Sequence, residues 1–117
     1  MEEQLLTKEG FKFLDSHVHF YDMKHPKLHY AHWQPDEDVP LRELGTRNYL
    51  ASDFIKEAQP LGMYKAIHVQ AAIGSDDPVE ETRWLEEVYK NTGIPNAIVG
   101  HVDLKAKDAR DVIEQHL

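Results

Sequence analysis

Two histidines separated by one residue are the feature of this sequence with the clearest chemical potential. His17 and His19 follow Asp15 in the segment LDSHVHFYD. If this segment is a β-strand, side chains two positions apart point to the same side, so both imidazoles face one point. Two imidazole nitrogens can bind one divalent ion such as zinc at about 2.0–2.1 Å. His17 and His19 are therefore the candidate catalytic residues, as a metal-binding or a substrate-binding pair.

Three segments are predicted to be strands, and each carries one polar face. They cover residues 11–19, 65–72 and 97–104, and their polar faces comprise Asp15, His17 and His19, then His68 and Gln70, then His101 and Asp103. We expect the apolar faces to pack on helices and the polar faces to point into a barrel or crevice. Ligand sites of such folds lie at the C-terminal ends of the strands. Gln70, His101 and Asp103 are therefore predicted to bind substrate. For His68 and His101 a hydrogen-bonded position in the core stays open as the alternative to a direct role.

A helix is predicted after each strand. The first covers residues 53–61 with Ser52 as its N-cap, the second is opened by Asp77 and Pro78 and stopped by Gly93, and the third covers residues 108–117. The glutamates of the second helix are predicted to form a solvated face. Alternation of strands and helices predicts parallel strands with right-handed crossovers.

The segment between the first strand and the first helix is long and rich in aromatic and histidine residues. Residues 20–48 include three prolines, which disfavour regular helix, and we expect them to form a loop over the pocket. His32 and Trp33 in this loop are predicted to contribute to substrate binding. Residues 1–10 are predicted to be a leader.

Composition excludes several functional classes. The 117-residue chain has a formal net charge of −8, which disfavours binding to nucleic acid or to an anionic membrane surface. It has no cysteine, which excludes disulfides, thiolate ligands and a cysteine nucleophile. The start MEEQLLTKEG lacks the pattern of a signal peptide, and no apolar run approaches the ~18 residues of a membrane span. The prediction is a cytoplasmic protein with a small-molecule substrate.

The motif LDSHVHFYD resembles the Asp-x-His-x-His opening of the amidohydrolase superfamily. The segments HVQAA, EETRWLEEV and AIVGHVDL are similar to the second and third strand–helix units of its lactonase-like branch, which includes sugar-lactone hydrolases and 2-pyrone-4,6-dicarboxylate lactonase. The resemblance covers residues 13–104 and implies a distorted (β/α)8 barrel that hydrolyses a lactone, ester or amide, in first place a lactonase of sugar or carboxylic-acid metabolism. In metal-dependent relatives the histidines equivalent to His17 and His19 hold a divalent cation, often zinc. In other relatives no metal is needed and they bind substrate, so both alternatives stay open.

The length of the chain qualifies this expectation. A (β/α)8 barrel typically needs ~250 residues, whereas this chain has 117. The fold expected is therefore α/β, a partial (β/α)8 TIM barrel comprising the first three strand–helix units of one domain over residues 1–117. Such an N-terminal fragment would be inactive alone and would need the rest of the barrel as a partner. The alternative is a non-catalytic small α/β domain for binding or homo-oligomerisation.

Overall fold

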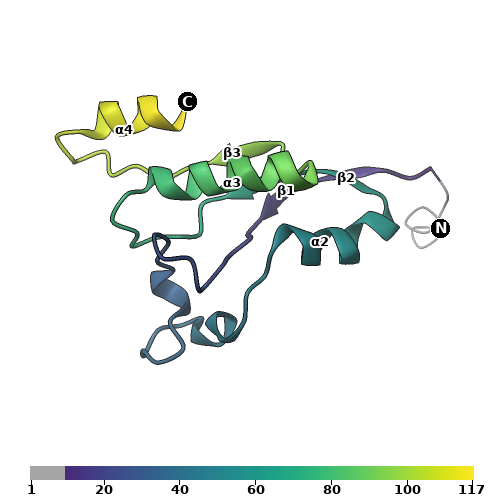
Figure 1. Ribbon diagram of the computed structural model, residues 1–117, viewed down its shortest axis with the longest axis horizontal. Helices are drawn as coiled ribbons and strands as arrows, with labels where there is room; N and C mark the ends of the chain where they lie inside the picture. The colour runs from purple at the N-terminus through teal and green to yellow at the C-terminus, as the bar shows by residue number, and fades with distance from the viewer. Residues whose placement is uncertain (1–9) are drawn as a thin grey trace.

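The computed structural model describes residues 10–117, so most of the predicted leader lies outside the described residues. Three strands alternate with three α-helices, and short 3-10 helices lie in the connections (Figure 1). In chain order the elements are β1 (Phe13–Val18), η1 (Ala31–Trp33), η2 (Arg42–Thr46), α2 (Ala51–Ala58), η3 (Gln59–Leu61), β2 (Met63–Val69), α3 (Val79–Thr92), β3 (Ala97–Val99) and α4 (Ala109–His116).

The strands form one parallel sheet in the order β1-β2-β3. This confirms the predicted alternation and the parallel direction. The predicted partial (β/α)8 barrel is wrong, because the described residues form a small open sheet of three strands and show no barrel. Strand β3 has three residues where eight were predicted, and the chain leaves the sheet at Gly100. There the His116 ring approaches so closely that a Cβ on Gly100 would lie 2.8 Å from its Nδ1 atom.

One face of the sheet is covered by helices, and the other is open. The strand register places Val18, His68 and Ile98 side by side on the covered face, where Val18 and His68 are buried. Ile67 and Val69 therefore belong to the open face, beside Ala97 and the half-exposed Val99. The predicted faces are correct for Val18 and Ile98 but inverted for β2. His68 was placed on the polar face because of its residue type; of the two roles left open for it, the structure shows the core histidine, buried with Nε2 against the Phe20 carbonyl oxygen.

The main core lies between the covered face of the sheet and helices α2 and α3. Its buried members are Val18, Phe20, Ala51, Ala58, Met63, Ala66, Leu85 and Ile94. Helix α2 begins after Leu50, whose N–H donates to Asp53 Oδ2 at 2.9 Å, so the predicted cap Ser52 lies inside the helix. Helix α3 begins at Val79 with Pro78 as its N-cap, one residue later than predicted, and Asp77 Oδ1 accepts the Val79 N–H at 2.9 Å.

The connection between β1 and α2 is held by a second group of buried side chains. This aromatic cluster comprises Tyr21, Leu28, Tyr30, Trp33, Ala71 and Ala72. The two alanines come from the segment directly after β2, so the connection packs against the C-terminal end of that strand. Across the described residues, every helix is too short or too polar to cross a membrane.

Candidate functional site

The two histidines of the motif face each other at the C-terminal end of β1. Their Nε2 atoms are 3.2 Å apart. His19 Nδ1 lies 2.8 Å from the Val69 carbonyl oxygen at the end of β2. A carbonyl oxygen only accepts, so His19 Nδ1 carries the hydrogen and donates it. The Nε2 atom of a neutral His19 therefore presents its lone pair toward His17.

This geometry fits a shared cation. Two nitrogens at ~2.0–2.1 Å from one ion in tetrahedral geometry lie about 3.3 Å apart, close to the observed 3.2 Å. The carbonyl that anchors the second ring nitrogen is the usual outer partner of a metal-binding histidine. Without a cation, and with both rings neutral, His17 Nε2 carries the hydrogen and donates it to His19 Nε2. Residues 10–117 contain no group of three or more ligand-type side chains, so this pair supplies two ligands.

Asp15 supports the backbone of the motif. Its Oδ1 atom accepts the His17 backbone N–H at 3.1 Å. The register between β1 and β2 is irregular from Asp15 to Val18. The aspartate therefore holds a local distortion of the strand, and the two imidazoles emerge directly after it.

His68 lies behind His19 and is fully buried, with 0% of its surface exposed. The pKa of His68 is lowered to about 4, mainly by burial; the contact of Nε2 with the Phe20 carbonyl oxygen at 3.3 Å opposes this shift, and the nearby His19 adds a smaller lowering effect. The ring is therefore neutral at physiological pH. Its centroid lies 6.1 Å from that of His19, so it packs beside the pair without adding charge.

Among residues 10–117, no hydrogen bond or ring contact joins the other predicted substrate-binding residues of the strands to this pair. Gln70 donates its backbone N–H to Val99 at 2.8 Å, and its buried Oε1 has no hydrogen-bond partner within the described part of the chain. His101 and Asp103 are exposed and line a different cavity of about 330 Å³ with Ser75 and Asp108. The short β3 explains the position of His101 and Asp103, because both residues lie beyond its end at Val99.

The two predicted site residues of the loop have different environments. His32 is exposed, and no hydrogen bond or ion pair among the described residues involves it. Trp33 is buried, with its ring edge-on to His19 at 5.9 Å and stacked on Tyr30 at 5.5 Å. The buried Trp33 ring therefore packs against His19 and offers no exposed face on which a substrate could stack.

Glu81 is a buried residue that the prediction of a solvated face placed wrongly. Only 5% of its surface is exposed. Its carboxylate accepts the N–H of Ala71 at 3.1 Å and that of Ala72 at 2.9 Å. Burial raises the pKa of Glu81, while the two N–H donors oppose the shift. The available signal was its spacing, because Glu81 lies one turn before Leu85 and shares the apolar stripe of α3.

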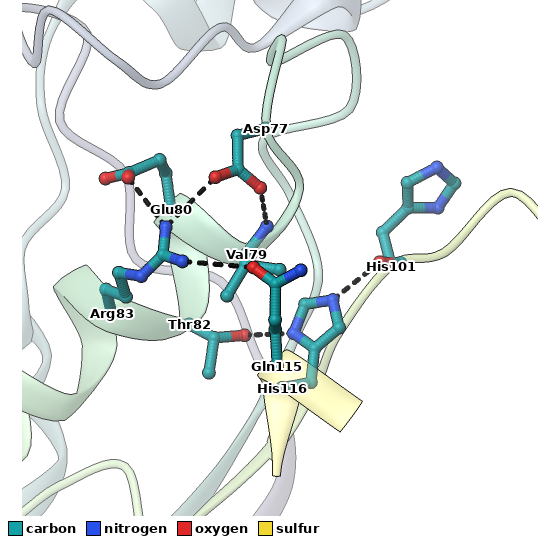
Figure 2. A network of polar contacts seen from close by, with 8 residues as sticks. All are labelled: Asp77, Val79, Glu80, Thr82, Arg83, His101, Gln115 and His116. Atoms are coloured by element: carbon teal, nitrogen blue, oxygen red, sulfur yellow. Dashed lines mark hydrogen bonds and ion pairs between the residues drawn. The ribbon is translucent and has the colours of Figure 1, made fainter. Parts of the chain in front are cut away.

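A second polar network, also missed from the sequence, ties α4 to α3 (Figure 2). His116 Nε2 donates to the His101 carbonyl oxygen at 2.7 Å, and His116 Nδ1 lies 2.7 Å from Thr82 Oγ1. In the same view the His101 ring points away from this network. Arg83 bridges Asp77 and Glu80 at 3.0 and 2.7 Å. Arg83 also donates to Gln115 Oε1 on α4 at 3.4 Å, so Arg83 and His116 hold the C-terminal helix in place, and neither contacts the paired histidines.

Comparison with known proteins shows a similarity in sequence but gives no activity. No known protein family matches the chain, and no solved structure matches it. An uncharacterized protein of Sinorhizobium fredii is 29% identical over 109 residues, which cover 89% of this chain and 35% of that protein. The chain thus spans about a third of the length of this curated relative. Since the relative's description names no activity, the function of this chain is inferred from the site itself.

Proposed function

We propose that His17 and His19 form part of the catalytic site of an amidohydrolase-type hydrolase that acts on a lactone, ester or amide carbonyl. The supporting observation is the 3.2 Å separation of their Nε2 atoms, with the His19 ring anchored on Val69. The resemblance of the Asp15–His19 motif to the amidohydrolases supports the same assignment. We further propose a small-molecule substrate and a cytoplasmic location, in keeping with the acidic, cysteine-free composition.

His17 and His19 would have different roles in the reaction. A divalent ion, zinc by preference, would lower the pKa of a bound water and polarise the substrate carbonyl. His19 supplies a fixed nitrogen because Val69 and Trp33 restrain its ring. His17 is exposed and so faces the side from which a substrate arrives. In a metal-free reaction, the His17 Nε2–H would instead donate a hydrogen bond to the substrate carbonyl oxygen and polarise it.

Zinc titration of the 117-residue chain by calorimetry tests the metal-dependent proposal. The wild-type chain should bind one zinc ion, and His17→Ala and His19→Ala should each weaken binding by about tenfold or more. His32→Ala is the matched control, because it removes an exposed histidine of the loop. Zinc binding that survives in both site variants, or that disappears in the control, would contradict the assignment.

A further inference from the structure

Glu81 is the only buried acidic residue of the described chain, and it has an unusual set of partners. Within residues 10–117 its carboxylate pairs with no lysine, arginine or histidine. Its polar partners there are the backbone N–H groups of Ala71 and Ala72. A buried carboxyl group without a cation partner has a desolvation cost, which its hydrogen bonds to residues 71–72 offset.

That segment begins two residues after the anchor of His19. The Val69 carbonyl oxygen accepts the hydrogen bond from His19 Nδ1 at 2.8 Å, and Ala71 and Ala72 follow directly. The chain leaves β2 at this point, so neighbouring strands no longer restrain residues 71–72. The Glu81 carboxylate replaces the missing strand partner, because it accepts both N–H groups that the sheet leaves free.

A second route leads from the same segment to His19. Ala71 and Ala72 belong to the aromatic cluster that buries Trp33. The Trp33 ring in turn lies edge-on to the His19 imidazole at 5.9 Å. Two of the contacts of the His19 ring, the hydrogen bond to Val69 and the edge-on contact with Trp33, therefore connect it to residues 71–72.

We infer that Glu81 is a positioning residue of the His17–His19 site, holding the end of β2 so that His19 keeps its Nε2 atom directed at His17. The inference rests on the proposed function for its significance. The contrary view is that Glu81 only stabilises a turn. The two views differ in what they predict for the His19 ring, since a purely structural residue would leave that ring unchanged in a variant that still folds.

The test compares Glu81→Leu and Glu81→Asp with Glu87→Gln, a control at an exposed site on the same helix. Leucine removes the acceptor, and aspartate keeps the charge but shortens the side chain. In the metal-free chain, long-range ¹H–¹⁵N NMR of the histidine rings should show that His19 loses its single Nδ1–H form in both Glu81 variants. With zinc alone as the probe, affinity should fall by about tenfold in Glu81→Leu and less in Glu81→Asp. Glu87→Gln should leave both readouts unchanged.

The outcomes separate this inference from the proposed function. A folded Glu81→Leu chain with wild-type His19 signals would overturn it. If Glu81→Leu does not fold, Glu81→Asp decides, and unchanged His19 signals there would equally overturn it. If the wild-type chain binds no zinc, the metal-dependent function fails, whereas the His19 signals of the metal-free variants still decide the role of Glu81.

Discussion

At the scale of single residues, solvation determines what each histidine can do. His17 and His19 lie within one motif with His17 exposed, whereas His68 is fully buried beside Phe20. Removing an imidazole from water penalises its charged form. The same side chain is therefore a candidate ligand at the end of β1 and a neutral packing group in β2.

Acid should destabilise the fold through His68. Its pKa is about 4 in the folded chain, whereas an imidazole exposed to water in the unfolded chain has the usual value of 6.5. The unfolded chain therefore binds more protons than the folded chain between these two pH values. The stability that this group contributes is fully present above pH 6.5 and is lost as the pH falls toward 4. Across this pH range the loss in the free energy of unfolding amounts to about 3 kcal/mol. Urea unfolding at pH 7 and at pH 4.5 should show a smaller loss in His68→Phe than in the wild type.

The exposed His101 provides the control for this experiment. His101→Phe should retain the pH dependence of the wild-type chain, because that side chain is in contact with water in the folded state. Equal losses of unfolding free energy in the wild type and in His68→Phe would contradict a neutral, buried role for His68.

At the scale of the elements, two glycines end helices in the same backbone conformation but in different surroundings. Gly62 follows η3 with φ +105°, and Gly93 follows α3 with φ +87°. A Cβ on Gly62 would overlap the Phe11 carbonyl oxygen, whereas a Cβ on Gly93 would meet no atom within 4 Å. Only Gly62 therefore combines a left-handed turn with a close approach of two backbone segments.

Alanine substitution at each position should distinguish the cost of the left-handed backbone conformation from the cost of the close contact with Phe11. Gly93→Ala should lower the free energy of unfolding by about 1 kcal/mol, the cost of a left-handed non-glycine residue. Gly62→Ala should cost at least about 1 kcal/mol more, because the backbone must also move away from Phe11. Chemical denaturation of both variants measures the difference. Equal losses would show that residues 11 and 62 separate at little cost.

At the scale of the whole molecule, the open sheet leaves apolar surface in contact with water. Strands β1 and β3 are the outer strands of the sheet. Val99 on β3 is 50% exposed, and Leu104 and Leu117 are more exposed still. Unpaired strand edges with apolar side chains favour association between chains.

Self-association should therefore depend on β3. Val99→Lys places a charge on the outer strand and should reduce the concentration-dependent increase in light scattering. Leu61→Lys is the control, because Leu61 is 56% exposed but lies in η3, before β2. A similar reduction in both variants would indicate a general effect of charge, independent of the strand edge.

The sequence by itself determined the order of the elements, their parallel arrangement and the position of the histidine pair. Each depends on local information: hydrophobic periodicity, turn and capping residues, and the two-residue repeat that brings His17 and His19 together. The 3.2 Å Nε2–Nε2 contact agrees with that expectation.

Only the tertiary structure decided which face of β2 is buried, where the sheet stops and what surrounds each polar side chain. His68 lies toward the helices, Glu81 is buried beneath the end of β2, and His101 lies beyond a shortened β3. These outcomes depend on register and desolvation among segments far apart in the chain. Residue type and local spacing contain no measure of either, so Glu81 was assigned to a solvated face although the packing buries it.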